Sequence, residues 1–436
     1  MKVLLCHNRY QQPGGEDRVF EAEADLLASR GHQVVRFERH NHELKQIGKL
    51  AAFKAAHWNE ATVRDLTALI EAERPDVMHC TNTFPLISPS AYHAARRLGV
   101  GVVQTLHNYR LICPSAQLFR DGKVCRDCAG RTLAWPALVH GCYRGDRAAT
   151  AAVVSMLAYH RAAGTWSSEV DRYIVLSAPA REEFVAAGLP ADKITVKPNF
   201  LAADPGPGKG VGNYAVFVGR LAEEKGVRTL LDAWRRLPGD VNLKIAGQGP
   251  LEELVSDACR EDRRISWLGH LSAPETYELI GQAQMLVVPS VWMEPFGLTV
   301  IEAFGKGTPV VASRAGALAE LVVDGITGRL VRPGDPDDLA QAVQRMLVDP
   351  AALKRMRERA RAEFEVRFTG ETNYRQLLGI YRSVAVRKQE RPTVGRTRRM
   401  VKSGAADPAN GLPPAGLQCP YQPPRSHENA QDTGNP

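Results

Sequence analysis

The chain has 436 residues, of which 44% are hydrophobic and 24% charged, which is typical of a water-soluble protein with two or three domains. No apolar run reaches the roughly 20 residues that a membrane-spanning helix needs, so a helical integral membrane protein is excluded. Half of the net charge of +8 lies in residues 386–436, so the preceding part is only mildly basic. This balance argues against a nucleic-acid-binding protein but is compatible with attraction to anionic lipids or phosphorylated ligands.

The first 200 residues alternate between strand and helix patterns. The N-terminus, MKVLLCHNRY, has too short an apolar run for a signal peptide, so we expect a first strand and a cytoplasmic protein. The expected strands are 3–5, 34–37, 76–80, 102–106 and 173–176, and the expected helices are 18–28, 61–72, 89–98, 147–163 and 179–187. The alternation predicts an α/β domain with a doubly wound parallel sheet, which binds ligands at the carboxyl ends of its strands.

Two features lie at such strand ends. His107 directly follows the fourth expected strand; a lone histidine is more often structural, but this position favours a ligand-binding role. Gly14 and Gly15 lie between the first strand and its helix. A glycine pair before a helix N-terminus can hold a phosphate, although the same pair is also ordinary turn chemistry.

Four cysteines follow the fourth strand with the spacing C-x11-C-x2-C-x13-C, namely Cys113, Cys125, Cys128 and Cys142. Four thiolates are a common ligand set for a structural zinc ion, and a turn-rich insert with little core needs such a cross-link. Disulfides are not expected in a reducing cytoplasm. Four unrelated buried thiols and a redox pair remain alternatives, and His140 is an alternative ligand.

A Pro/Gly-rich linker at 204–212 precedes a second run of strand and helix patterns, which opens with a strand at 214–218. Arg220 follows this strand, and Lys225 lies five residues later near an expected helix start. Two cations at a strand end can neutralise a diphosphate. The alternative is a solvated strand end, the usual surrounding of Lys and Arg.

The most distinctive stretch is residues 290–313, SVWMEPFGLTVIEAFGKGTPVVAS, in which seven residues separate Glu294 from Glu302. An apolar run at 285–288 predicts a strand, and helical spacing follows over 298–304. Glu294 is therefore expected in a strand-to-helix loop, and Glu302 one or two turns into the helix. Free N–H groups at the helix start suit a phosphate, and the two acids suit the hydroxyls of a sugar and a ribose. The alternative is a pair of exposed, inert glutamates.

The last part of the chain carries weaker signals. The acids at 335–338 include a D-x-D that could bind a metal, but they precede a helix expected at 339–347, so we interpret them as caps. Residues 374–384 have the spacing of an amphipathic helix. From about residue 387 the chain loses periodicity and is expected to be disordered.

The two glutamates, together with Arg220 and Lys225, resemble the E-x7-E signature and the phosphate-binding cations of retaining glycosyltransferase family four. The resemblance implies the α/β GT-B fold, with two Rossmann-like, doubly wound parallel-sheet domains that face a cleft; the four-cysteine insert would mark a subgroup. The implied parts are an acceptor-side domain at 1–203 with the insert at 113–142, a linker at 204–212, a nucleotide-sugar-binding domain at 213–368, a crossover helix at 369–385 and a basic, Pro-rich tail at 386–436.

The resemblance also implies roles for the matching residues. Arg220 and Lys225 would stabilise the leaving diphosphate, Glu294 and His107 would position the transferred sugar, and Glu302 would hold the nucleotide ribose. The donor diphosphate would lie against Phe296, Gly297 and Leu298 and, from the other domain, Gly14 and Gly15. This sequence departs from the family at Asn108, where an Asp commonly follows the histidine, and at Ala317, where many relatives have a second glycine.

The implied activity is transfer of a hexosyl group from a UDP- or GDP-sugar to a glycan or lipid-linked acceptor, in surface polysaccharide biosynthesis. Catalysis would need no metal, and zinc would be structural. The expected location is the cytoplasm, with a peripheral contact to the inner face of the membrane and no nucleic-acid partner. Two alternatives share the fold, a nucleotide-sugar epimerase and a non-catalytic sugar-nucleotide-binding protein; the intact set of two cations and two acids favours the transferase.

Overall fold

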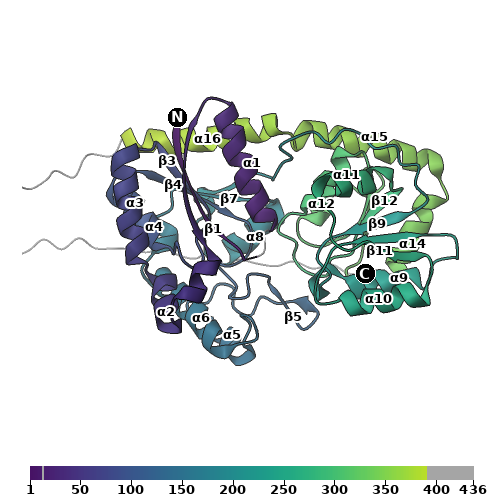
Figure 1. Ribbon diagram of the computed structural model, residues 1–436, viewed down its shortest axis with the longest axis horizontal. Helices are drawn as coiled ribbons and strands as arrows, with labels where there is room; N and C mark the ends of the chain where they lie inside the picture. The colour runs from purple at the N-terminus through teal and green to yellow at the C-terminus, as the bar shows by residue number, and fades with distance from the viewer. Residues whose placement is uncertain (12–13, 390–436) are drawn as a thin grey trace, which may run out of the picture. The chain divides into compact units, whose positions relative to one another are not determined.

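The structure is a computed structural model that describes residues 1–11 and 14–389. The described residues form two parallel sheets of six strands each and a two-stranded antiparallel hairpin (Figure 1). Most of the expected tail, from residue 390 on, lies outside the described residues.

The first sheet has the strand order β2-β1-β3-β4-β7-β8. Its strands are β1 (Lys2–Arg9), β2 (Gln33–His40), β3 (Val77–Asn82), β4 (Gly101–Leu106), β7 (Arg172–Val175) and β8 (Ile194–Val196). Its connecting helices include α1 (Gly15–Ser29), α3 (Glu60–Glu73), α4 (Ser90–Arg97), α8 (Ala178–Ala186) and the 3-10 turn η2 (Ala191–Lys193). The order reverses between β1 and β3, which is where a doubly wound sheet binds its ligand.

The second sheet has the order β11-β10-β9-β12-β13-β14. Its strands are β9 (Ala215–Val218), β10 (Leu243–Ala246), β11 (Ile265–Trp267), β12 (Met285–Val288), β13 (Val310–Ser313) and β14 (Gly328–Val331). Between them lie η3 (Glu223–Lys225), α9 (Val227–Trp234), α10 (Glu252–Glu261), α11 (Ala273–Gln282), α12 (Leu298–Gly305) and α13 (Leu318–Leu321), and α14 (Pro336–Leu347) follows the last strand. Here the order reverses between β9 and β12.

Both sheets are buried on both faces, as parallel sheets generally are. Every residue of β3, β4, β12 and β13 is buried, which explains the continuous apolar run of β12, whereas β3 and β4 also bury polar side chains. The expected doubly wound α/β architecture is therefore confirmed. The D-x-D is confirmed as a cap, because Asp335 accepts hydrogen bonds from the N–H groups of Asp337 and Asp338 at the start of α14.

An excursion of the chain separates β4 from β7. It contains the hairpin β5 (Phe119–Arg120) and β6 (Lys123–Val124), then α5 (Trp135–His140), α6 (Arg147–Ala162) and α7 (Thr165–Ser168). A second short excursion, η1 (Asn41–Gln46) and α2 (Lys49–His57), follows β2 and packs on α6. The sequence predicts α6 but neither the hairpin nor α2 and α5; the hairpin strands and α5 are too short to show periodicity.

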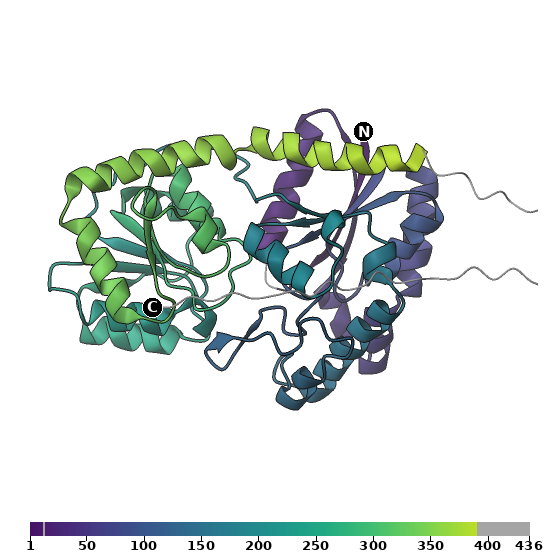
Figure 2. The ribbon, with the colours of Figure 1, turned by 180° about the vertical axis from the view of Figure 1, so that it is seen from behind.

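Two helices complete the described chain, α15 (Pro350–Arg367) and α16 (Gly370–Gln389). Phe364 of α15 belongs to a core cluster of the second sheet, whereas Leu377 and Tyr381 of α16 pack with Val3 and Val77 of the first sheet. Figure 2 shows α16 as the yellow helix beside the purple and blue strands. None of the described helices is long and apolar enough to cross a bilayer.

Candidate active site

Lys225 and Glu294 meet at the reversal point of the second sheet. Lys225 ends the turn η3 that follows β9, and Glu294 lies in the loop between β12 and α12. The Lys225 Nζ donates to Glu294 Oε1 at 3.0 Å and to Oε2 at 2.9 Å. Ser290 and the indole N–H of Trp292 also donate to Oε2, at 3.2 and 2.9 Å. The buried carboxylate therefore has a fixed orientation, with a partly exposed ammonium group beside it.

The backbone explains why these two residues meet. The Val291 N–H donates to the Glu224 carbonyl at 3.0 Å, which joins the Lys225 turn to the glutamate loop. Gly226 has φ +71°, and a Cβ there would lie 1.9 Å from the Pro289 carbonyl oxygen, so only glycine allows this approach. The local glycine therefore holds the ammonium group next to the carboxylate.

A second glycine supports the same loop from the other side. Gly316 has φ +52°, and a Cβ there would lie 2.5 Å from the Glu294 carbonyl oxygen. The next residue, Ala317, is fully buried, and its N–H donates to that carbonyl at 2.9 Å. The close backbone approach thus falls at Gly316, and the departure from a glycine pair at Ala317 is accommodated.

Glu302 lies on α12, buried, and its Oε1 accepts a hydrogen bond from Arg18 of α1 at 3.2 Å. Burial raises the pKa of Glu302, and the Arg18 charge opposes this shift. Residues from the two sheets thus meet here, because Gly15 at the start of α1 is also close to Leu298: a Cβ on Gly15 would lie 2.8 Å from a Leu298 methyl group. Both expected positions, Glu294 in the loop and Glu302 within the helix, are confirmed.

The start of α12 leaves N–H groups available. Gly297 precedes the helix with φ +116°, and no side chain caps it. The Phe296 side chain is buried and packs against Phe368, so only its backbone can face a ligand. An uncapped helix start is a suitable site for an anion, and the buried acids on either side can accept hydrogen bonds from ligand hydroxyls.

Arg220 stands apart from this cluster in its contacts. It is exposed, two residues after the end of β9, and its guanidinium has no hydrogen-bond or ion-pair partner among the described residues. The structure therefore brings Lys225 to Glu294 and Glu302 to Arg18, but it does not bring Arg220 into contact with any of them.

His107 follows β4 and is buried in the first sheet. Burial lowers its pKa to about 3, so the ring is neutral at neutral pH. Its Nε2 has no hydrogen-bond partner within the described part of the chain. Buried polar atoms are rarely left unpaired, so this nitrogen is a candidate contact for a ligand hydroxyl.

A polar cluster that the sequence analysis did not identify lies at the ends of β1 and β4. The Asn108 amide donates to Glu16 Oε1 at 2.7 Å, and the Tyr10 hydroxyl donates to Glu16 Oε2 at 2.9 Å. Burial raises the pKa of Glu16, although both hydrogen bonds oppose the shift. The signal available in the sequence was Glu16 itself, directly after the glycine pair, and Asn108, directly after His107.

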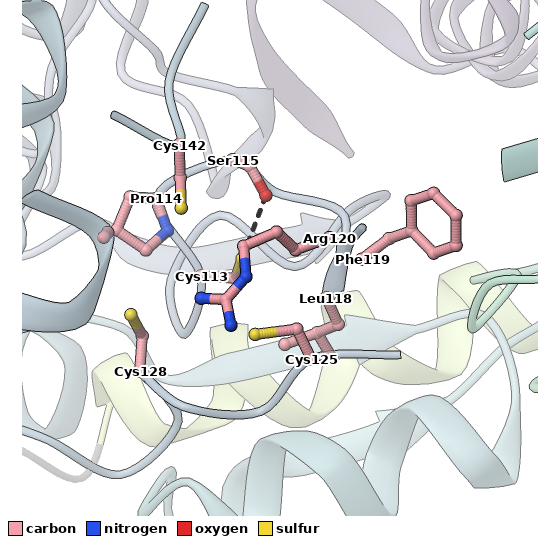
Figure 3. Close-up of a pocket in the computed structure, with 10 residues that line it drawn as sticks. Cys113, Pro114, Ser115, Leu118, Phe119, Arg120, Cys125, Cys128 and Cys142 are labelled. Atoms are coloured by element: carbon pink, nitrogen blue, oxygen red, sulfur yellow. Dashed lines mark hydrogen bonds between the residues drawn. The ribbon is translucent and has the colours of Figure 1, made fainter. Parts of the chain in front are cut away.

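The four cysteines of the insert line one small cavity of about 10 Å³, and Arg120 reaches into it (Figure 3). Burial raises the pKa of Cys128 to about 11 and also raises that of Cys142, and the neighbouring thiols add to both shifts. As the side chains stand, no three of the described His, Cys, Asp or Glu residues are gathered closely enough to hold a metal ion. The cysteines thus converge without forming a finished metal site.

Comparison with known proteins bears on both halves of the chain. Residues 13–204 match the family model "Glycosyltransferase Family 4", and residues 207–363 match "Glycosyl transferases group 1". The solved structure of Anabaena Alr3699/HepE in complex with UDP-glucose aligns with a TM-score of 0.64 at 18% identity, covering 87% of this chain and 99% of that one. The chain therefore has the GT-B fold, and each half matches a glycosyltransferase family model.

Other known proteins resemble this chain at different levels. Sucrose-phosphate synthase from Thermosynechococcus elongatus aligns with a TM-score of 0.65 at 21% identity, covering 88% of this chain and 99% of that one. Glycogen synthase of Mycobacterium tuberculosis is 40% identical over 164 residues, which are 36% of this chain and 39% of the relative. A mannosyltransferase of Mycolicibacterium hassiacum is 36% identical over 170 residues, 37% of this chain and 41% of the relative. The matches thus span about two fifths of these curated relatives.

Proposed function

We propose that this GT-B protein transfers a hexosyl group from a nucleotide-diphosphate sugar to a glycan or lipid-linked acceptor, with retention of anomeric configuration. The observation that carries the proposal is the Lys225–Glu294 pair beside the uncapped start of α12. The ammonium group suits a leaving diphosphate, and the carboxylate suits sugar hydroxyls. UDP is the favoured carrier, because a structural neighbour is described in complex with UDP-glucose.

The proposed reaction takes place on one face of the sugar. The acceptor oxygen bonds to the anomeric carbon as the bond from that carbon to the diphosphate oxygen breaks, and the acceptor proton passes to the leaving phosphate oxygen. Lys225 and Arg220 stabilise the negative charge that develops on the diphosphate. Glu294 and the neutral His107 hold the sugar, and Glu302 accepts a hydrogen bond from the ribose. Gly14, Gly15 and the backbone from Phe296 to Leu298 surround the diphosphate.

In the free protein Lys225 forms an ion pair with Glu294, so donor binding must break this ion pair. The diphosphate would compete for the ammonium group, and a sugar hydroxyl would replace it as a donor to the carboxylate. Because Lys225 is partly exposed, it can reach a ligand without moving the backbone. Arg220, exposed and unpaired in the described chain, would join the second phosphate.

The test is donor binding and turnover in matched variants. Wild type should be thermally stabilised by its donor in a panel of UDP- and GDP-sugars and should release the nucleoside diphosphate only when an acceptor is present. Lys225→Ala and Glu294→Ala should abolish transfer and keep the wild-type circular dichroism spectrum. Lys354→Ala and Glu253→Ala, both at exposed positions, are the controls. Wild-type rates in either site variant would refute the assigned roles.

The same panel separates the alternatives. An epimerase would convert the donor sugar with no acceptor present, and a binding protein would be stabilised by a donor without any turnover.

The acceptor side belongs to the first sheet, where Tyr10, Glu16 and Asn108 offer hydrogen-bonding groups. We place the reaction in the cytoplasm, at the inner face of the membrane, and we assign it to surface polysaccharide assembly.

We also propose that the four cysteines of the insert hold a structural zinc ion. They come from separate turns and line one cavity of about 10 Å³. The insert contains three of the six non-glycine residues with positive φ in the described chain, Ala116, Leu118 and Asp121, and such strained turns need an external constraint. Zinc binding would require the thiols to turn inward and Arg120 to leave; Arg120 can do so, because it already pairs with Asp121 and Asp127 at the surface.

Metal analysis of the full chain tests this site. About one zinc per chain is expected, and Cys125→Ser with Cys128→Ser should lose it and lower the melting temperature. Cys259→Ser, a partly exposed cysteine of α10, should keep the zinc. Protein purified with zinc available that contains no metal would end the proposal.

A further inference from the structure

Exposed apolar side chains gather on one face of the first sheet's domain. The described residues include 13 large hydrophobic side chains that are exposed, and seven of them lie on or beside α2, α5 and α6. We call this surface the α2–α5–α6 face; its apolar residues are Ile47, Leu50, Phe53, Leu133, Trp135, Val139 and Tyr159. Scattered exposed apolar residues need no explanation, but a concentration of them marks an interaction site.

Direct contacts make this face continuous. The His57 ring of α2 is hydrogen bonded to the Ser155 hydroxyl of α6 at 2.9 Å. Arg161 of α6 donates to the carbonyl of Arg131, which precedes α5, and to the Leu111 carbonyl at 3.2 Å. Figure 1 shows α2, α6 and α5 next to one another. The elements that carry these apolar residues are therefore adjacent in the fold.

Helix α2 is unusual because it buries almost nothing. Of its nine residues only Ala56 is buried, while Leu50 is 69% and Phe53 is 40% exposed. A helix of this length is marginal in water by itself, and packing of an apolar face normally stabilises it. Helix α2 packs on α6, but its largest apolar residues remain exposed, which leaves them available to a partner outside the chain.

The same face carries the positive charge of the protein body. Residues 44–59 contain three Lys and no acid, and residues 128–168 contain four Arg and a single acid, Asp146. Together these segments have a charge of +6, whereas the rest of residues 1–385 sums to −2. Asp146 is occupied as the cap of α6. Six of the seven cations are exposed and form no ion pair among the described residues; they are Lys45, Lys49, Lys54, Arg131, Arg144 and Arg147.

We propose that the α2–α5–α6 face docks on an anionic lipid bilayer. An amphipathic surface with Leu, Phe and Trp among unpaired Lys and Arg is what interfacial membrane binding requires, since the apolar groups enter the headgroup region and the cations attract the lipid charge. A protein partner would have to supply a matching acidic surface with an apolar centre; a second copy of this face, equally basic, does not. The proposal rests on the membrane location given in the proposed function and assigns that contact to a defined surface of the fold, on the evidence of its exposed residues.

Vesicle co-sedimentation of the full chain tests the proposal. Wild type should bind vesicles of mixed phosphatidylglycerol and phosphatidylcholine, bind vesicles of phosphatidylcholine alone far less, and release with rising salt. Two variants, Leu50→Ser with Phe53→Ser and Lys49→Glu with Lys54→Glu, should each lower the partition coefficient about tenfold or more. The control, Val348→Ser with Val366→Ser, removes equally exposed apolar residues beside α14 and on α15 and should bind as wild type does.

Two further measurements distinguish a loss of membrane binding from misfolding and show which part of the chain binds the membrane. Donor-induced thermal stabilisation should be unchanged in all variants, so a loss of vesicle binding cannot be attributed to unfolding or to the donor site. Equal binding of wild type and both face variants would overturn the proposal and assign the membrane contact to the basic segment after residue 386. A change in oligomeric mass caused by the face variants would overturn it too, since it would make the surface a subunit interface.

Discussion

At the scale of single residues, the Glu302 carboxylate can accept more hydrogen bonds than it receives from the described protein groups. It is buried, and its only side-chain partner among the described residues is Arg18, which is more than half exposed. Burial raises the pKa of Glu302, so one exposed cation does not fully compensate for the lost solvation. A ribose hydroxyl would supply the second donor that the carboxylate lacks.

Glu302→Ala is therefore expected to weaken donor binding more than it slows the chemistry. A hydrogen bond to a charged group contributes about 1.5–3 kcal/mol, so the KM for the donor should rise about 10- to 100-fold. Since the ribose is remote from the reacting bond, kcat should change little. Steady-state kinetics with calorimetric donor titration measures both, and Glu253→Ala is the matched control. A fall in kcat at unchanged KM would contradict the ribose role.

Glu302 also shows which features of the site the sequence predicts and which it does not. The strand-to-helix position of Glu294 and the helical position of Glu302 were predictable, because apolar runs and a glycine delimit them locally. The hydrogen-bond partner of Glu302 was not predictable, because Arg18 lies 284 residues away in the sequence. The residue spacing of its helix gives no information about contacts with the other sheet. Local patterns place a side chain at the edge of a sheet; they do not pair it across the fold.

At the scale of elements, three buried histidines in the first half of the chain should make its stability sensitive to low pH. They are His79 on β3, His107 after β4 and His160 on α6. Burial lowers their pKa values to about 4, 3 and 4. The unfolded chain binds a proton at each histidine below pH ~6.5, whereas the folded chain does not until far lower pH. Stability is therefore full above pH ~6.5 and falls as the pH drops toward 4.

The free energy of unfolding should thus decrease between pH 6.5 and 5 by up to ~1.4 kcal/mol per pH unit for each histidine. Carboxylates with lowered pKa values, such as Asp17 and Glu23, contribute only below pH ~4.5, whereas the raised pKa values of Glu16 and Glu302 partly offset the histidine effect as the pH falls. Urea unfolding at several pH values measures the slope. His160→Gln should reduce it by about one third, and the exposed control His270→Gln should leave it unchanged. A flat profile from pH 7 to 5 would contradict the expectation.

The elements that sequence reasoning missed share one property. The hairpin β5–β6 has two residues in each strand, and α5 has only six residues. Such elements show no measurable period, and tertiary contacts decide their conformation. The cysteine spacing pointed to the insert, but neither the mutual approach of the thiols nor the presence of Arg120 among them could be derived from spacing.

At the scale of the whole molecule, α16 returns from the second sheet's helices to the first sheet. The Tyr381 hydroxyl is hydrogen bonded to His79 at 2.8 Å, and Asn373 accepts from the buried Lys197, which also donates to Glu23 at 2.8 Å. A buried ion pair is weak evidence for stability, but losing one partner leaves a buried charge. The helix therefore packs on the first sheet through specific polar contacts as well as apolar ones.

Leu377→Ala tests how much this return contributes. Leu377 is fully buried against the first sheet, in a cluster with Val3, Leu5 and Val103. Removing it should lower the free energy of unfolding by about 2–5 kcal/mol, since a buried leucine leaves a cavity that the rigid sheet cannot fill. Arg382→Ala, exposed on the same helix, should change it by less than about 0.5 kcal/mol.

Donor affinity gives the second readout of the same variant, measured in native buffer where the fold persists. Lys225, Glu294 and Glu302 all belong to the second sheet, so Leu377→Ala should leave donor affinity within about twofold of wild type while urea unfolding shifts to a lower midpoint. Equal loss of donor affinity and stability would instead mean that α16 sets the geometry of the donor site. The wild-type unfolding midpoint in Leu377→Ala would mean that α16 contributes nothing to the first sheet's core.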